Sequence, residues 1–129
     1  MKFLLDTHAF LWWIGNDDQL SDTARAAIAD PDNEVFFSVV SAWEMAIKIR
    51  SGKLLSIPTT LTAFLQKHLR KNALSVMPIS LEHSLQITEL PPLHRDPFDR
   101  MLVAQAQVEK LQLITRDPEI AKYAVNICW

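Results

Sequence analysis

The stretch Lys2-Phe3-Leu4-Leu5-Asp6 opens the sequence as an apolar run that ends in a carboxylate. A run without polar alternation is typical of a strand that helices cover on both faces of a parallel sheet. Asp6 then lies at the carboxyl end of the strand, where open α/β folds bind their ligands. Asp6 and Thr7 also precede a short helix, so the alternative interpretation is that one of them caps its N-terminus.

Length and composition are those of one compact domain. The 129 residues are 49% hydrophobic and 22% charged, and we expect a single domain over residues 1–129. The net charge of -2 gives no general attraction for nucleic acid, so such a role depends on local basic patches. The lone Cys128, the lack of a signal peptide and the lack of a membrane-spanning run predict a cytoplasmic protein without a membrane partner.

Strands and helices alternate along the rest of the sequence. Runs rich in β-branched or aromatic residues predict strands at residues 35–40, 75–79, 111–115 and 125–127. Amphipathic segments with capping residues predict helices at residues 9–14, 22–29, 41–49, 81–89 and 97–109, and a helix opened by Thr59 or Thr60 that carries Leu61 to Leu69. The alternation predicts an α/β fold with a mostly parallel sheet.

Acidic side chains recur at equivalent places in this pattern. Asp6 and Asp117 follow apolar strands, while Glu44 and Asp99 lie in the first turns of predicted helices. In a parallel sheet, the ends of the strands and the starts of the following helices share one edge. We therefore expect these carboxylates to converge.

The later acids also have a purely structural interpretation. Ser41-x-x-Glu44 matches a capping box, and Asp96-Pro97-Phe98-Asp99 matches a capped helix start with an acid near the positive end of the helix dipole. Asp117-Pro118 is a candidate for another cap. The alternative function is therefore a non-catalytic protein-interaction module in which the acidic residues only cap helices.

Converging carboxylates would repel one another unless a cation were present. Oxygen donors without a cysteine cluster or an H-x-x-x-H pair suit magnesium or manganese rather than zinc. Because substrate phosphates usually complete the coordination of such ions, the pattern indicates hydrolysis of a phosphodiester. His8 and His94 lie near the acidic motifs, but a lone histidine is more often a packed or surface residue than a catalyst.

The chain resembles a PIN-domain ribonuclease, specifically a VapC-like toxin of a type II toxin–antitoxin pair, over essentially its whole length. The resemblance is carried by four short motifs, Leu4-Leu5-Asp6-Thr7-His8, Ser41-Ala42-Trp43-Glu44 with Ala46-Ile47-Lys48, His94-Arg95-Asp96-Pro97-Phe98-Asp99-Arg100 leading into Ala104-Gln105-Ala106, and Thr115-Arg116-Asp117. It implies a three-layer α/β/α sandwich, magnesium-dependent endoribonuclease activity with manganese as a substitute, a homodimer and inhibition by a cognate antitoxin.

The resemblance also implies roles for individual residues. The metal-binding and catalytic carboxylates of the family map onto Asp6, Glu44, Asp99 and Asp117. The third motif contains Asp96 as well, but Asp99 directly precedes the following helix in the family register. Asp96 would then be a cap or a supporting residue.

Other residues near the acidic motifs are candidates for supporting roles. Thr7 and Thr115 are candidates to orient water or a carboxylate. Arginines flank the acidic motifs and are expected to contact RNA phosphates, with surface ion pairing as the alternative; they are Arg95, Arg100 and Arg116.

Aromatic residues near the acidic motifs indicate a protein partner. Trp12, Trp13 and Trp43 predict an antitoxin that supplies an apolar helix and a basic side chain. A homodimer is expected mainly from the resemblance. A further alternative keeps the metal site but acts on DNA or another phosphoester.

Overall fold

The computed structural model describes residues 1–53 and 57–129 and contains a five-stranded sheet in the order β3-β2-β1-β4-β5. Its strands are β1 (Lys2–Leu5), β2 (Glu34–Ser38), β3 (Ser75–Met77), β4 (Gln112–Ile114) and β5 (Ile127–Cys128). Neighbouring strands are parallel throughout, and β1 lies at the centre between β2 and β4. The predicted parallel sheet is therefore confirmed.

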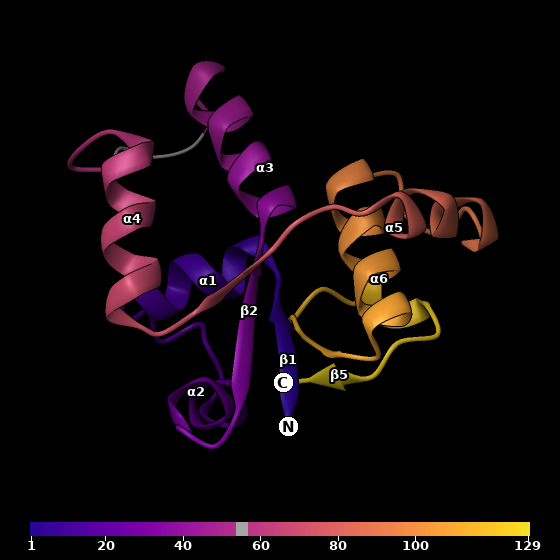
Figure 1. Cartoon of the computed structure of the whole chain (residues 1–129), viewed down its shortest axis with the longest axis horizontal. Helices are drawn as coiled ribbons and strands as arrows, with labels where there is room; N and C mark the ends of the chain where they lie inside the picture. Colours follow the sequence, from indigo (N-terminus) through magenta and orange to yellow (C-terminus); the bar gives the residue numbers. More distant parts are fainter. Residues whose placement is uncertain (54–56) are drawn as a thin grey trace.

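Helices cover both faces of this sheet. They are α1 (Thr7–Ile14), α2 (Asp22–Ala29), α3 (Val39–Arg50), α4 (Leu61–Lys71), α5 (Leu81–Gln86) and α6 (Pro97–Glu109), with the short 3-10 helices η1 (Ile87–Glu89) and η2 (Ile120–Lys122). Figure 1 shows α1, α2 and α4 on one side of the sheet and α5 and α6 on the other. The fold is the expected three-layer α/β/α sandwich. Within the described ranges, no helix combines the length and the apolarity needed to cross a membrane.

The central strand β1 is buried on both faces, which explains its unbroken apolar run. Phe3 and Leu5 pack into one hydrophobic cluster with Phe10 of α1, whereas Leu4 packs into a second cluster with Leu102 of α6. Successive side chains of a strand point to opposite faces, so a strand between two helical layers needs an apolar residue at every position. Full burial of each such side chain contributes about 1.5–3 kcal/mol.

The start of α3 differs from the prediction. Val39 and Val40, predicted to end a strand over residues 35–40, form the first turn of α3, and the hydroxyl of Ser38 caps it by accepting from the Val40 N–H at 3.0 Å. The capping-box interpretation of Ser41 is therefore wrong, and Glu44 lies in the second helical turn rather than the first. The β-branched valines favour a strand, but packing of the buried Val40 against the sheet overrides this propensity.

The remaining boundaries differ from the predictions by a few residues. The predicted strands 75–79, 111–115 and 125–127 are β3, β4 and β5, and the predicted helix 81–89 is α5 followed by η1. Thr60, not Thr59, caps α4 by accepting from the Ala63 N–H at 3.2 Å. Helices α2 and α6 have the predicted bounds, and Asp96 and Pro97 occupy the predicted N-cap and first helical positions of α6.

Candidate active site

The acidic residues gather at the carboxyl edge of the sheet. Asp6 directly follows β1, and Asp117 follows β4, the neighbour of β1. Helix α3 begins directly at the end of β2 and carries Glu44, while the start of α6 carries Asp99. Four segments far apart in the sequence therefore contribute to one site.

Asp6 is both a helix cap and a site residue. Its Oδ1 accepts from the Ala9 N–H at 2.7 Å and caps α1, whereas its Oδ2 accepts from the hydroxyl of Thr115 at 2.5 Å. Burial raises the pKa of the Asp6 carboxyl despite these two hydrogen bonds, and the charge of Asp117 raises it further. The two interpretations of Asp6 in the sequence are therefore compatible.

Glu44 is held by side chains from two helices. The Thr7 hydroxyl of α1 donates to Glu44 Oε1 at 2.7 Å and lies 2.9 Å from the hydroxyl of Ser41. The ammonium group of Lys48, one turn further along α3, lies 2.5 Å from Glu44 Oε2. Both carboxylate oxygens of this buried side chain are therefore fixed in place. Lys48 and Ser41 belong to a sequence motif quoted above, but their contacts with this site were not predicted.

His94 lies between two further carboxylates. Its Nε2 is 3.0 Å from Asp99 Oδ2 and 3.3 Å from Asp117 Oδ2, and its Nδ1 accepts from the Asp96 N–H at 3.2 Å. One ligand atom from each of His94, Asp99 and Asp117 lies within 4.8 Å of the other two. An Nδ1 that accepts leaves the ring proton on Nε2, facing the carboxylates. This role of His94 was missed, because only the fold brings residues 94 and 117 together.

The pKa of Asp99 depends on burial and on several charged neighbours at the site. The pKa of Asp99 is raised to about 7, mainly by burial and then by the charge of Asp96, with smaller increases from Glu44 and Asp6 and a decrease from His94. Glu44 and Asp6 therefore lie close enough to Asp99 for their charges to act on it. Such a cluster favours uptake of a proton or a cation.

Asp96 has the position of a cap rather than of a central carboxylate. Its Oδ1 accepts from the N–H groups of Phe98 and Asp99 at 2.8 and 3.3 Å. These bonds fix the first turn of α6 and thereby the position of Asp99.

The arginines occupy different surroundings. Arg100 donates to the carbonyl of Pro91 at 3.1 Å and to the hydroxyl of Tyr123 at 3.3 Å, so it ties the segment before α6 to the rest of the fold. Arg95 is exposed. Arg116 lies 4.6 Å from the centre of the Trp12 ring and donates to Gln19 at 3.3 Å. Only Arg116 of these three lines the cleft beside the carboxylates.

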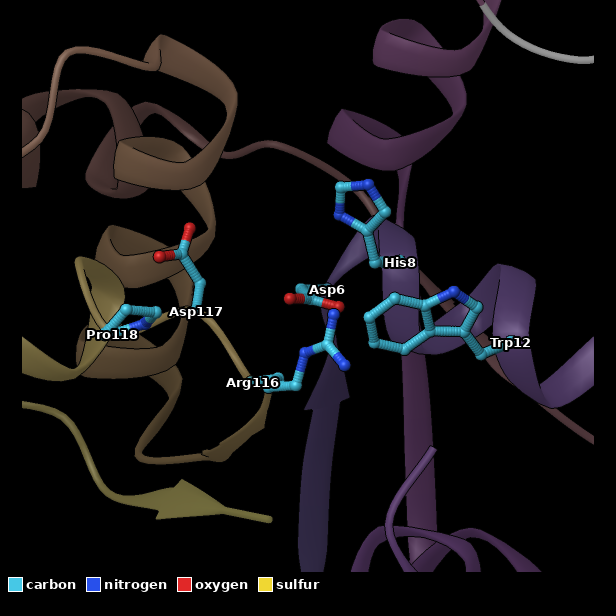
Figure 2. Close-up of a pocket in the computed structure, with 6 residues that line it drawn as sticks. All are labelled: Asp6, His8, Trp12, Arg116, Asp117 and Pro118. Atoms are coloured by element: carbon cyan, nitrogen blue, oxygen red, sulfur yellow. The ribbon is translucent and has the colours of Figure 1, made fainter. Parts of the chain in front are cut away.

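This cleft has a volume of about 260 Å³ and opens beside Asp6 (Figure 2). Its lining residues come from the end of β1, from α1 and from the segment after β4; they are Asp6, His8, Trp12, Arg116, Asp117 and Pro118. The sequence indicated the acids and Arg116, but it did not indicate that His8 and Trp12 share a cleft with them.

The donor set fits a divalent cation that prefers oxygen ligands. Asp6, Glu44, Asp99 and Asp117 supply carboxylate oxygens, and the charges of Glu44 and Asp6 act on Asp99, whose pKa is raised mainly by burial. His94 lies beside them as a hydrogen-bond donor, because its Nε2 carries the ring proton. The chemistry of the site therefore suits a divalent cation that prefers oxygen ligands.

Comparisons with known proteins agree with this fold. Similar solved structures include VapBC2 from Rickettsia felis bound to a promoter DNA fragment (TM-score 0.73, 15% identity, covering 98% of this chain and 97% of that chain). VapBC-1 from nontypeable Haemophilus influenzae has a TM-score of 0.64 and 16% identity, covering 98% of this chain and 96% of that chain. VapBC-5 from Mycobacterium tuberculosis, a member of the VapBC family of toxin-antitoxin systems, has a TM-score of 0.57 and 20% identity, covering 98% and 94%.

The sequence comparisons identify the family. No curated protein matches the chain significantly. At 15–20% identity, the structural similarities concern the fold alone. The family model of the PIN domain, in contrast, matches residues 3–126. Because this match covers nearly the whole sequence, the chain belongs to the PIN domain family.

Proposed function

We propose that the chain is a magnesium-dependent endoribonuclease, the VapC-like toxin of a type II toxin–antitoxin pair, and that it acts in the cytoplasm as a single domain over residues 1–129. The observation that carries the proposal is the convergence of Asp6, Glu44, Asp99 and Asp117 from four separate segments at one edge of the sheet. Family membership and the VapBC structures with the same fold support it.

In this proposal the four carboxylates are the metal ligands, either directly or through water. Magnesium, or manganese in its place, would activate water and neutralise charge on the phosphate. The hydroxyl of Thr115 orients Asp6, while Thr7 and Lys48 fix Glu44. Ligands that are already oriented bind a metal more tightly, because less freedom is lost on binding.

We expect His94 to position the carboxylates of Asp99 and Asp117. Its neutral ring carries one proton, on Nε2, and directs this N–H toward both carboxylates as a hydrogen-bond donor. Asp96 supports this arrangement by accepting from the Asp99 N–H and by donating its own backbone N–H to His94.

Basic side chains are expected to hold the RNA backbone. Arg95 is exposed and Arg116 lines the cleft, so both are available for phosphate contacts, which supply most of the affinity for nucleic acid. Arg100 is a weaker candidate, because its hydrogen bonds to Pro91 and Tyr123 already engage it in the fold.

Exposed apolar side chains on α3 and α5 are candidate contact surfaces for protein partners. On α3, Trp43 and Ile47 are 52% and 44% exposed near the acidic site, and we propose this surface for an apolar helix of the antitoxin. A basic side chain of the antitoxin would then reach the carboxylates.

On α5, Leu81 and Leu85 are 75% and 59% exposed and one turn apart, and we propose that they meet the same residues of a second copy.

A cleavage assay tests the proposed function. Total RNA and single-stranded DNA are incubated with the protein in magnesium, in manganese and in chelator, and the products are mapped. We expect cleavage of RNA that requires metal. Cleavage of DNA alone would indicate the phosphoester alternative, and intact RNA under all conditions would favour the non-catalytic interaction module.

A further inference from the structure

We propose that the cleft beside the carboxylates binds an unpaired nucleobase of single-stranded RNA, stacked against Trp12, next to the phosphate that is cleaved. This inference rests on the proposed function, because it concerns the substrate of the same site. It assigns the cleft a ligand class and assigns Trp12 a role in substrate binding.

The cleft has two chemically different walls. Figure 2 shows the Asp117 carboxylate on one side of the cleft and the Trp12 ring on the other, with the Asp6 carboxylate between them and the His8 ring toward the Trp12 side. The two rings have centroids 5.5 Å apart and planes inclined by 34°. His8 is exposed and Trp12 is half-buried, so part of the aromatic wall reaches solvent, and the exposed Arg116 lies over the Trp12 ring.

A nucleotide has two parts that match these walls. Its phosphate belongs near the carboxylates and their cation, and its base has an apolar face that stacks on aromatic side chains. A base inside a duplex is already stacked and paired, so it cannot occupy such a wall. The two-walled cleft therefore selects RNA that is unpaired beside the cut.

Trp12 is held in place before any ligand binds. Its ring packs against Trp129, with centroids 5.9 Å apart, and the guanidinium of Arg116 lies 4.6 Å from its centre. A ring fixed in this way loses little freedom when a base stacks on it. Arg116 is held at the same place by the ring and by Gln19, where its charge can also meet the RNA backbone.

These contacts also raise a competing explanation for Trp12. The ring could serve only to position Arg116, which would then act on a phosphate. Removal of Trp12 would in that case weaken every RNA equally, with or without a base at the cleft. A stacking role predicts a loss that depends on the base.

The test measures binding without metal and cleavage with magnesium for the wild type, Trp12→Ala and Trp12→Phe. The binding probes are a short labelled single-stranded RNA, the same strand with abasic riboses in place of its nucleotides, and its duplex. We expect Trp12→Ala to weaken binding of the intact strand about tenfold and to raise its KM similarly. The abasic strand should bind both proteins alike, Trp12→Phe should restore most of the affinity, and the duplex should bind the wild type more weakly.

The ratio of the affinities for the intact and the abasic strand distinguishes a lost stacking contact from misfolding. Partial unfolding of Trp12→Ala lowers the apparent affinity for both strands by the same factor, so it cannot imitate a base-dependent loss. Equal losses for both strands, or no loss for either, would overturn the base subsite.

The same experiment separates this inference from the proposed function. A wild type that cleaves RNA but shows no base dependence at Trp12 refutes the base subsite alone. If the wild type cleaves nothing in magnesium, the proposed nuclease activity is refuted. If Trp12→Ala still binds the intact strand more weakly than the wild type does, with no change for the abasic strand, the base subsite is nevertheless supported.

Discussion

The two halves of the acidic site differ in how deeply their carboxylates are buried. Asp6 and Glu44 have both carboxylate oxygens engaged, and the Glu44 side chain is only 4% exposed. Asp99 and Asp117 are 19% and 32% exposed and share the ring of His94, and Asp117 also accepts from the Glu119 N–H at 2.8 Å. We call the first pair the fixed half and the second pair, which contains Asp99 with its raised pKa, the responsive half.

This difference shows how one site can combine carboxylates of fixed orientation with a carboxyl whose protonation changes near neutral pH. Hydroxyl groups from Thr7 and Thr115 orient the fixed half and add no charge of their own. The responsive half carries the carboxyl whose pKa is raised to about 7, that of Asp99. Substitutions in the two halves should therefore have different effects on activity and on stability.

The largest effect is expected from Asp99→Asn in the responsive half. Loss of this carboxylate should lower RNA cleavage by about 100-fold or more, as loss of one preorganised catalytic group commonly does. Metal-free stability at pH 8 should rise by about 1 kcal/mol, because one of several repelling charges is removed. Cleavage rates and urea unfolding measure the two effects, with Asp18→Asn in the exposed turn after α1 as the charge-matched control. Wild-type activity in Asp99→Asn would remove Asp99 from the mechanism.

The fixed half should respond through metal affinity. Thr115→Val removes the hydroxyl that orients Asp6 but keeps the volume of the side chain, and it should weaken magnesium binding about 10- to 100-fold. Calorimetric titration measures this change. Thr115→Ser keeps the hydroxyl and should restore most of the affinity, so equal binding by the Val and Ser variants would show that the hydroxyl has no such role.

The pH dependence should come from the responsive half. The pKa of Asp99 rises from 3.8 to about 7 on folding, so between these values the folded state keeps a proton that the unfolded state has released. This protonation difference makes stability fall as pH rises through the interval, by at least about 1 kcal/mol, and the cost is constant above it. Metal-free unfolding from pH 4 to 8 should show this decline in the wild type and much less of it in Asp99→Asn.

The same protonation should oppose metal binding. A carboxyl must lose its proton before it binds a cation, so magnesium affinity should increase as pH rises toward 7. Titration of the wild type at several pH values measures this increase. An affinity that is flat across the interval would place the titrating group outside the metal site.

The smallest effect is expected from the ion pair of the fixed half. Lys48→Met leaves the buried Glu44 without its cation, and metal-free stability should fall by about 1 kcal/mol. Lys122→Met is a matched control, because Lys122 and Glu119 form a pair whose side chains are 55% and 44% exposed. Its loss should cost about 0.3 kcal/mol. Thermal unfolding of both variants measures the difference, and equal losses would show that Glu44 needs no compensation.

Local sequence signals predicted the parts of the fold that depend on local causes. The apolar run of β1 indicated burial on both faces, and Asp96-Pro97 indicated the start of α6 to the residue. The start of α3 was predicted wrongly, because the β-branched Val39 and Val40 favour a strand and only their packing places them in a helix. The predicted convergence of the acids followed from strand and helix order alone.

The contacts of the responsive half could not be predicted from the sequence. His94 lies next to a predicted motif, but its contact with Asp117 spans 23 positions and depends on how α6 and the end of β4 meet. The pairing of Arg116 with Trp12 likewise joins α1 to the segment after β4. Such contacts leave no periodic signal in a single sequence.

Asp6→Asn tests the central claim, that the four carboxylates form one metal site. Asn can still cap α1 through its side-chain oxygen, so the fold should survive the substitution. Melting of both proteins in magnesium and in chelator, beside the RNA cleavage assay, is the decisive measurement. We predict that Asp6→Asn loses cleavage, that its metal-free stability is unchanged or higher by about 1 kcal/mol, and that magnesium stabilises the wild type more than the variant. An Asp6→Asn protein that keeps the full magnesium response and still cleaves RNA would contradict the account.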